Sequence, residues 1–291
     1  MKMASFSTEG RDSYGVLLSD GRIVDLGARM NSSASTLKEF LSLDDGEAQA
    51  RAIIDSGVSD GSLEDVTLAP PIPDPGAIWC AGINTHSHFK EVAHRVNMAE
   101  EPPYPLLFMR GAATLVASGD TLEKPKLEKL FDYEGEIAIV IGKRARNVSP
   151  EEAMAHIGGY SAFNDATARG YQRTSSQMTA GKNAYRSGGF GPYITLASAI
   201  DPKSLTMQCR VNGEVRQNMD TGDLIFGFGE LVSFISEFTW LEPGDVIVTG
   251  SPIGIGAVQK PPRTLQAGDV VEVEVSGVGT LVNTVADQPA L

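Results

Sequence analysis

The segment that most constrains the fold is residues 131–142, which read Phe-Asp-Tyr-Glu-Gly-Glu-Ile-Ala-Ile-Val-Ile-Gly. The apolar run predicts a buried strand. Because side chains alternate along a strand, Glu134 and Glu136 at its entrance point to the same face. Two carboxylates held this close beside an apolar run repel each other and need a compensating cation or a proton. A divalent, oxygen-preferring metal meets that need. The alternative is a solvated strand end whose glutamates face water, and this strand alone leaves both interpretations open.

Short apolar runs separated by 31 glycines and 16 prolines predict a β-rich core with few long helices. Near the N-terminus, residues 14–26 form a predicted hairpin, and polar helical residues follow from about 36 to 54. The proline cluster at 70–75 forms a stiff connector. We therefore expect a small N-terminal α+β module at residues 1–70 and a larger domain at residues 71–291.

The larger domain is predicted to contain many strands and few helices. Ser149 and Pro150 begin a helix as N-cap and first residue, and it should stop near Gly158. The strand that follows should bring Asn164 and Asp165 to its C-terminal end. Further elements are expected as buried strands at 77–83 and 106–109, a hairpin turn at 211–214, a packing helix around 231–238, and strand-entry turns at the Gly-Asp pairs 119–120, 244–245 and 268–269.

Charge and composition narrow the class of partner. A net charge of -13 argues against nucleic acid and against an anionic membrane surface. No apolar run approaches membrane-spanning length, and the first ten residues lack the apolar stretch of a secretory signal. The two cysteines are far apart, which disfavours a disulfide framework and a thiolate zinc site. We expect a protein of the reducing cytoplasm that binds a small molecule.

A second polar constellation follows the strand predicted at 77–83. If a short helix begins near Ser87, His88 and Glu91 lie on one face at i and i+3. A carboxylate beside an imidazole raises its basicity and fixes its tautomer, which suits proton abstraction from water. His86, His88 and His94 could instead form a metal site, and a polar surface loop is the third interpretation. The local pattern does not choose among them.

Two further clusters carry polar side chains. Asp165 at a strand end is followed by Arg169 and Gln172, which form either a site or an ordinary helix cap. Lys182 lies in a glycine-rich loop, where it either faces a substrate oxygen or is solvated. Phosphate-binding glycine motifs and the G-x-S-x-G nucleophile motif are absent, which disfavours nucleotide cofactors and serine hydrolases.

Taken together, these segments resemble the fumarylacetoacetate hydrolase family from about residue 75 to 285, with a small N-terminal module ahead. The resemblance is carried by residues 78–91, Asp-Tyr-Glu-x-Glu at 132–136, Asn-Asp-Ala-Thr-Ala-Arg-Gly-Tyr-Gln at 164–172, Gly-Lys at 181–182, Gly-Pro at 191–192, Leu-Glu-Pro-Gly-Asp-Val-Ile-Val-Thr-Gly-Ser-Pro at 241–252 and Gly-Thr-Leu-Val-Asn at 279–283. Each segment alone is weak evidence for the family, but the number of matching segments and their order make the resemblance specific.

The resemblance implies a mostly β, α+β fold of irregular antiparallel sheets rolled around a central metal site, in a homodimer. It implies Mg²⁺, with Mn²⁺ or Ca²⁺ as alternatives, on Glu134, Glu136 and Asp165. It implies a catalytic group of His88, Glu91 and Lys182. The substrate-binding positions that it implies are Arg169, Gln172, Tyr185 and Ser251.

Four positions depart from the usual family pattern: Thr85 replaces a tyrosine, Gly170 an acid, Tyr185 an aspartate and Ser251 a threonine. We expect hydrolytic cleavage of a carbon–carbon bond in a 1,3-dicarbonyl, acylpyruvate-like acid, with a role in the breakdown of aromatic compounds. The alternatives are a lyase of the same family, acting as a β-keto acid decarboxylase or as a hydratase or isomerase of a 2-oxo-dienoate, and a catalytically idle metal-binding protein.

Overall fold

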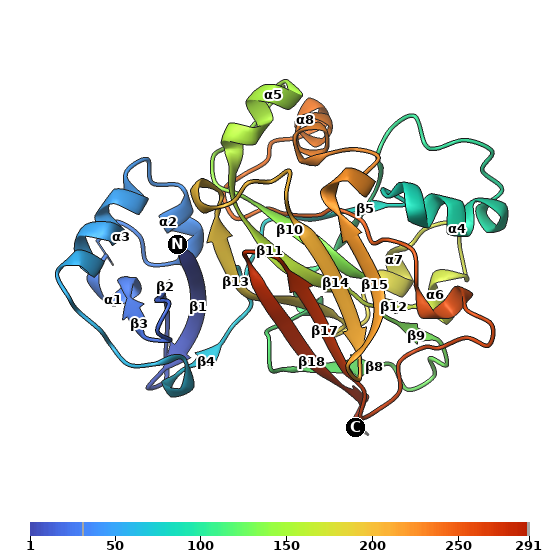
Figure 1. Ribbon diagram of the computed structural model, residues 1–291, viewed down its shortest axis with the longest axis horizontal. Coiled ribbons are helices and arrows are strands. Elements are labelled where there is room, and N and C mark those ends of the chain that lie inside the picture. Colours follow the sequence, from blue (N-terminus) through green and yellow to red (C-terminus); the bar gives the residue numbers. More distant parts are fainter. Residues whose placement is uncertain (31, 290–291) are drawn as a thin grey trace.

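The computed structural model describes residues 1–30 and 32–289. The protein is a mixed α+β structure built mostly of sheets, as the sequence predicted (Figure 1). A large sheet runs through the centre, a second sheet packs on one of its faces, and the helices lie around the edges. Most strand pairs in the described residues are antiparallel, and three are parallel.

The large sheet has 11 strands. In spatial order they are β3 (Ile23–Asp25), β2 (Arg11–Leu17), β1 (Lys2–Thr8), β13 (Gly188–Leu196), β11 (Ile157–Asp165), β10 (Gly135–Ile141), β16 (Val246–Val248), β5 (Ile78–Gly82) and β6 (Leu106–Arg110), with β4 (Thr67–Leu68) on β1 and β7 (Leu115–Val116) on β13. The second sheet runs β15 (Glu214–Asp220), β14 (Thr206–Val211), β17 (Val270–Val275), β18 (Gly279–Asp287) and β8 (Thr121–Lys124), and β9 (Phe131–Asp132) pairs with β12 (Thr167–Ala168).

The helices are short. They are α1 (Leu26–Arg29), α2 (Leu37–Leu41), α3 (Gly46–Asp55), α4 (His86–Val96), α5 (Pro150–Ala153), α6 (Arg169–Gln172), α7 (Thr179–Lys182) and α8 (Phe228–Phe238). Single 3₁₀ turns occur at Leu63–Asp65, Ala112–Thr114, Met154–His156, Ala197–Ala199, Thr221–Asp223 and Gly256–Val258. Within the described residues, no helix has the length and apolar character needed to cross a membrane.

Strand β10 lies at the centre of the core, and every residue in it is buried. Its side chains alternate: Ile137, Ile139 and Ile141 face the second sheet, whereas Ala138 and Val140 face the core shared with the N-terminal strands. Full burial of each large aliphatic side chain contributes about 1.5–3 kcal/mol. This burial fixes the register of the strand, and therefore fixes which face its glutamate occupies.

Gly135 separates the two glutamates because the second sheet approaches the backbone there. A Cβ at this position would lie 2.7 Å from Cys209 Cβ and 3.0 Å from Met207 Sδ. We expect Gly135→Ala to lower the free energy of unfolding by about 1–3 kcal/mol, the usual cost of overpacking. Gly111, where the nearest atom would be 3.6 Å from a new Cβ, is the matched control. Urea unfolding that ranks Gly111→Ala as the less stable variant would contradict this packing.

Several expected elements are confirmed. The hairpin of β2 and β3, the helices α2 and α3, the β14–β15 hairpin and α8 lie where the sequence predicted them. The N-terminal strands, however, continue the large sheet, because β1 pairs with β13. The division between residues 70 and 71 therefore stays a prediction, since the two regions share one sheet.

Two details were wrong. The helix that Ser149 caps ends at Ala153, followed by a 3₁₀ turn, and Gly158 lies inside β11 rather than at the helix end. The reason is close backbone approach: a Cβ on Gly158 would lie 2.9 Å from the Cα of Gly142, the residue directly after β10. Strand β6 is an edge strand, not a fully buried strand: two of its five residues are exposed, two are half-buried and one is buried.

Candidate metal centre and active site

Three carboxylates meet where β10 and β11 run side by side. Glu136 lies on β10, Glu134 directly precedes it, and Asp165 ends β11. The backbone N–H of Asp165 donates to the carbonyl of Glu134 at 2.8 Å, which fixes the register between the two strands. One oxygen of each carboxylate lies within 4.8 Å of the others, and all three residues are buried. The two glutamates therefore lie on one face, as predicted, and Asp165 lies beside them.

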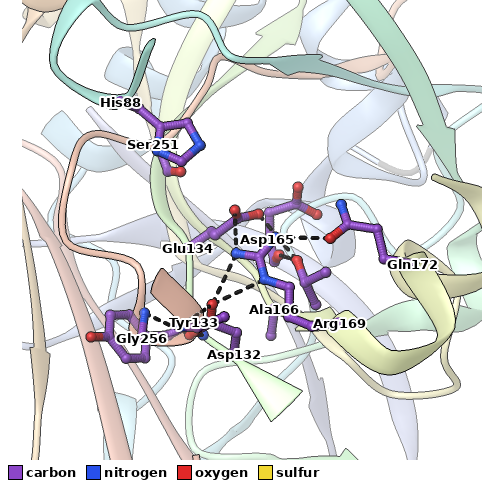
Figure 2. Close-up of polar contacts among 12 residues, drawn as sticks. His88, Asp132, Tyr133, Glu134, Asp165, Ala166, Arg169, Gln172, Ser251 and Gly256 are labelled. Atoms are coloured by element: carbon purple, nitrogen blue, oxygen red, sulfur yellow. Dashed lines mark hydrogen bonds and ion pairs between the residues drawn. The ribbon is translucent and has the colours of Figure 1, made fainter. Parts of the chain in front are cut away.

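Three buried cations balance part of this charge, and Figure 2 shows one of them, Arg169, between Asp132 and Glu134. Arg169 Nη2 donates to Glu134 Oε1 at 2.7 Å, and its Nε donates to Asp132 at 3.0 Å. Lys182 Nζ contacts Glu134 and lies 2.5 Å from Asp165 Oδ2. The guanidinium of Arg110 lies 2.5 Å from Asp165 Oδ1. Four buried carboxylates therefore face three cations.

Glu136 is the carboxylate without a cation. In the described chain its hydrogen bond comes from the backbone N–H of Gly250, at 2.5 Å. Burial, together with the carboxylates of Asp165 and Glu134, raises the pKa of Glu136 well above its usual value. For Glu134, burial acts in the same direction, but the Arg169 guanidinium and the Lys182 ammonium outweigh it and hold its pKa well below the usual value. Glu136 therefore lacks the cationic compensation that Glu134 has.

These residues fit a divalent cation. The donor set is all oxygen, which suits Mg²⁺, Mn²⁺ or Ca²⁺ rather than a thiolate- or imidazole-preferring ion. An added positive charge would compensate the carboxylate of Glu136, which accepts a single N–H donor among the described residues. The residues left open whether Lys182 faces a substrate oxygen or is solvated, and the family resemblance implied a catalytic role. The structure places its ammonium between Glu134 and Asp165, at the wall of a cavity.

The His88–Glu91 pair forms on helix α4, which follows β5. His88 Nδ1 lies 2.9 Å from Glu91 Oε2, and Glu91 Oε1 accepts the backbone N–H of Gly254 at 3.0 Å. Because a carboxylate accepts, the proton belongs on Nδ1, which leaves Nε2 free to act as a base. His88 is buried and lines the same cavity as the carboxylates. This arrangement can take a proton from a molecule bound there.

This helix begins at His86, close to Ser87, where the sequence placed its start. Thr85 is the N-cap: its hydroxyl accepts the N–H of His88 at 3.2 Å and donates to the carbonyl of Ser251 at 2.8 Å. The Ser87 hydroxyl does not cap the helix but donates a hydrogen bond to the carboxylate of Asp223. The departure at Thr85 therefore has a structural role, because it fixes the start of α4 against the 251–254 turn.

The alternative histidine metal site does not form. His86 Nδ1 pairs with Glu101 at 2.6 Å, whereas His88 pairs with Glu91. Side chains two apart on a helix point in different directions, which separates the two rings. Among the described residues, the one group of three or more clustered metal-binding side chains is the carboxylate triad.

The cavity has a volume of about 260 Å³. Besides the triad and His88, it is lined by four residues that the sequence had selected, two on α6, one at the end of α7 and one in the turn after β16: Arg169, Gln172, Lys182 and Ser251. All predicted site residues except Glu91 and Tyr185 therefore line this cavity. Glu91 does not line it, but its carboxylate holds His88 through Nδ1.

Tyr185 does not line this cavity. Its side chain is 65% exposed, and it borders a separate hollow with Tyr171 and Ala184. Helix α7 ends at Lys182, so three residues later the chain has already left the site. The position of Tyr185 gives no support to a substrate-binding role.

A carboxylate from another segment lies beside Gly170, the position where the family pattern has an acid. Glu128 accepts the backbone N–H groups of Leu130 at 2.6 Å, Gly170 at 2.8 Å and Tyr171 at 3.3 Å. A Cβ on Gly170 would lie 2.9 Å from both of its oxygens. Glycine is therefore needed at 170 so that Glu128 can hold the start of α6, and with it Arg169.

Sequence reasoning missed two charged residues. Arg110 ends the apolar run of β6, and Asp132 accepts from Arg169 and from the backbone N–H groups of Gly256 and Ala257. A charged residue directly at the end of an apolar strand was the available signal for Arg110.

Comparison with known proteins adds the family context. A model of the C-terminal domain of fumarylacetoacetate (FAA) hydrolase matches residues 77–286. The chain is 35% identical over 292 residues to a Xenopus laevis protein named oxaloacetate tautomerase fahd2, mitochondrial, covering 98% of this chain and 90% of that one.

Two solved structures share the fold. A fumarylacetoacetate hydrolase from psychrophilic Exiguobacterium antarcticum superposes with a TM-score of 0.83 at 32% identity, covering 99% of this chain and 100% of that one. Maleylpyruvate hydrolase from Sphingobium sp. SYK-6, solved with manganese(II) and pyruvate, gives a TM-score of 0.81 at 25% identity with the same coverage.

Proposed function

The chain belongs to the fumarylacetoacetate hydrolase family, and we propose that it is a metal-dependent tautomerase that interconverts the keto and enol forms of oxaloacetate or a similar short 2-oxo dicarboxylic acid. The observation that carries this proposal is the buried carboxylate triad, which opens into the same small cavity as the free face of His88. The Xenopus relative named for this activity, which spans nearly the whole chain, supports the choice of reaction.

Glu134, Glu136 and Asp165 would hold the metal, which supplies Lewis-acid polarisation of oxygens on a 2-oxo acid when bound. Lys182 adds a fixed positive charge at the cavity wall beside two of these carboxylates. Such a preorganised charge stabilises an oxygen that becomes negative as an enolate forms.

His88 moves the proton in this scheme. In the keto-to-enol direction its Nε2 takes a proton from the carbon next to the ketone and gives it to the enolate oxygen. In the enol-to-keto direction it takes the proton from the enol oxygen and gives it to that carbon. Glu91 keeps the proton on Nδ1 and stabilises the imidazolium that forms, and Gly254 holds Glu91 in place. Tautomerisation consumes no water, so one base and a stabilised enolate oxygen are sufficient.

Hydrolysis of a carbon–carbon bond in an acylpyruvate-like acid is the second candidate, and the His88–Glu91 pair favours it. The same base can take its proton from water, which then attacks the carbonyl, while Lys182 and Gln172 lie on the cavity wall where an oxyanion would form. The two reactions differ in whether His88 acts on carbon or on water.

Assays on two substrates separate these candidates. Purified protein with Mg²⁺ or Mn²⁺ should speed the decay of enol-oxaloacetate absorbance above the spontaneous rate, and EDTA should abolish the increase. Pyruvate release reports decarboxylation of oxaloacetate, and loss of acetylpyruvate reports hydrolysis. Cleavage of acetylpyruvate without tautomerisation would replace the first candidate with the second. Pyruvate release as the main reaction would favour the decarboxylase, and no metal-dependent turnover of either compound would contradict both candidates.

A homodimer, a cytoplasmic location and a role in the breakdown of aromatic compounds remain part of the proposal. The dimer and the catabolic role rest on the family resemblance, and the location rests on the reduced, widely separated cysteines. Light scattering at twice the chain mass is the expected result for the dimer.

A further inference from the structure

Four cationic side chains line the cavity, and they fall into two pairs: Arg169 and Lys182, and Arg95 and Arg173. The first pair is buried and neutralises the carboxylate cluster. Arg169 is bound by Asp132 and Glu134, and Lys182 contacts the triad at two of its carboxylates. Their charge is already balanced inside the protein, so they offer little net attraction to a second anionic group on a substrate.

Arg95 and Arg173 are different because neither has an acidic partner in the described chain. Arg95 Nη2 donates to the backbone carbonyl of Val258 at 3.1 Å, a contact that leaves its positive charge uncompensated. Every arginine in the described chain pairs with a carboxylate except Arg95, Arg146 and Arg173. Arg146 is bound to backbone carbonyls near α8, away from this cavity. The other two both line the same cavity, in a protein with 37 acidic and 24 basic residues. Two unpaired guanidinium groups at one cavity of so acidic a protein indicate an anionic ligand.

Helix geometry explains how Arg95 reaches the site. Arg95 follows His88 by seven residues, or about two turns, so both lie on one face of α4, with Val92 between them. The helix rise separates their Cα atoms by about 10 Å along the axis. Arg173 is the C-cap of α6, the helix that begins with Arg169. The two elements that carry proposed active-site groups therefore each present an unpaired arginine to the cavity.

The charge of the triad decides where the second carboxylate of a substrate can lie. The 2-oxo acid end belongs at the metal, and a second carboxylate is repelled from the carboxylate cluster. A guanidinium fork binds a carboxylate through two parallel N–H donors, with geometry that an ammonium does not provide. We propose that Arg95 and Arg173 bind this second carboxylate and make the enzyme selective for dicarboxylic over monocarboxylic 2-oxo acids. This assignment rests on the proposed function, which it deepens by naming the residues that select the substrate.

Kinetics on a diacid and a monoacid test the assignment. Arg95→Gln and Arg173→Gln should each raise the KM for enol-oxaloacetate by about 10-fold, and the double variant by about 100-fold, with kcat changed less than about threefold, in line with the loss of charged hydrogen bonds. Turnover of enol-phenylpyruvate, which has one carboxylate, should stay within about threefold of wild type. Lys90→Gln removes the same charge from an exposed position of α4 outside the cavity and should change neither substrate.

The outcomes separate this inference from the proposed function. Equal losses on both substrates, an unchanged KM for oxaloacetate, or an effect of Lys90→Gln as large as that of Arg95→Gln would overturn the arginine assignment alone. If wild type turns over neither substrate, the proposed function fails, and calorimetry with malonate decides the arginine assignment independently. Malonate binding about 10-fold or more weaker in the Mg²⁺-loaded double variant supports the assignment. Malonate affinity that is equal in both proteins, or too weak to measure in both, overturns it.

Discussion

Replacing His88 with alanine is expected to lower kcat by roughly 10²–10⁴-fold, the usual loss on removal of a positioned general base. The loss follows from geometry, since His88 lines the cavity while Glu91 holds its Nδ1 at 2.9 Å. Mn²⁺ affinity, measured by calorimetry, should be unchanged because no imidazole belongs to the carboxylate cluster.

His86→Ala is the matched control for this prediction. His86 lies on the same helix but pairs with Glu101 and does not line the cavity. Its loss should leave kcat within about threefold of wild type. Normal turnover in His88→Ala together with an inactive His86→Ala would mean that the proton is moved by the other histidine.

Replacing Glu136 with glutamine is expected to abolish measurable Mn²⁺ binding and, at the same time, to stabilise the metal-free protein at neutral pH. Glu136 is the one carboxylate of the triad that no cation compensates in the described chain. A neutral amide of the same shape removes the repulsion and the cost of burying a charge, which we expect to raise the free energy of unfolding by on the order of 1–3 kcal/mol.

The pH dependence of this gain follows from the raised pKa of Glu136. The folded metal-free protein binds this proton more tightly than the unfolded chain does, so the stability of wild type falls as pH rises above the ordinary glutamate pKa of about 4.3. Below that pH both states are protonated and the penalty is absent. Calorimetric melting in EDTA should therefore show wild type and Glu136→Gln close together near pH 4 and the variant more stable near pH 7.

Two controls accompany this experiment. Glu100→Gln, at an exposed position with no ion pair in the described chain, should melt like wild type at both pH values. Added Mg²⁺ should raise the melting temperature of wild type but not of Glu136→Gln, because a ligand stabilises only a protein that binds it. A variant that is less stable than wild type at pH 7 in EDTA would contradict the charge account.

Asp165 would be a poorer choice for the same test. Besides Lys182, it binds the fully buried guanidinium of Arg110 at 2.5 Å. Asp165→Asn would leave that guanidinium without its carboxylate, and breaking a buried pair costs about 3–5 kcal/mol. The structure shows which cation each carboxylate pairs with. Because Glu136 has no such pair in the described chain, Glu136→Gln removes a proposed metal ligand without breaking a buried ion pair, whereas Asp165→Asn breaks one.

Local periodicity explains why much of the site was predictable. Strand alternation put Glu134 and Glu136 on one face, and helical spacing put His88 beside Glu91. Both rules act over a few residues and survive any tertiary arrangement that keeps the element intact.

The features that the sequence did not reveal depend on contacts between distant segments. Arg110 reaches Asp165 across 55 positions, and Glu128 reaches Gly170 across 42. Ile83 adopts a left-handed backbone conformation with φ of 52°, which costs a β-branched residue about 1–3 kcal/mol. No local propensity predicts it. Asn84 holds the segment by accepting the N–H of Phe226 at 2.9 Å and donating to the carbonyl of Thr249 at 2.8 Å.

The central claim is that the buried triad is a divalent metal centre, and anomalous diffraction from crystals grown with Mn²⁺ tests it most directly. The account predicts one strong anomalous peak within bonding distance of Glu134, Glu136 and Asp165, with water or substrate oxygens in the remaining coordination positions. The peak should vanish in Glu136→Gln crystals. A peak at His86 and His94 instead, or full Mn²⁺ occupancy at the triad in Glu136→Gln, would contradict the account.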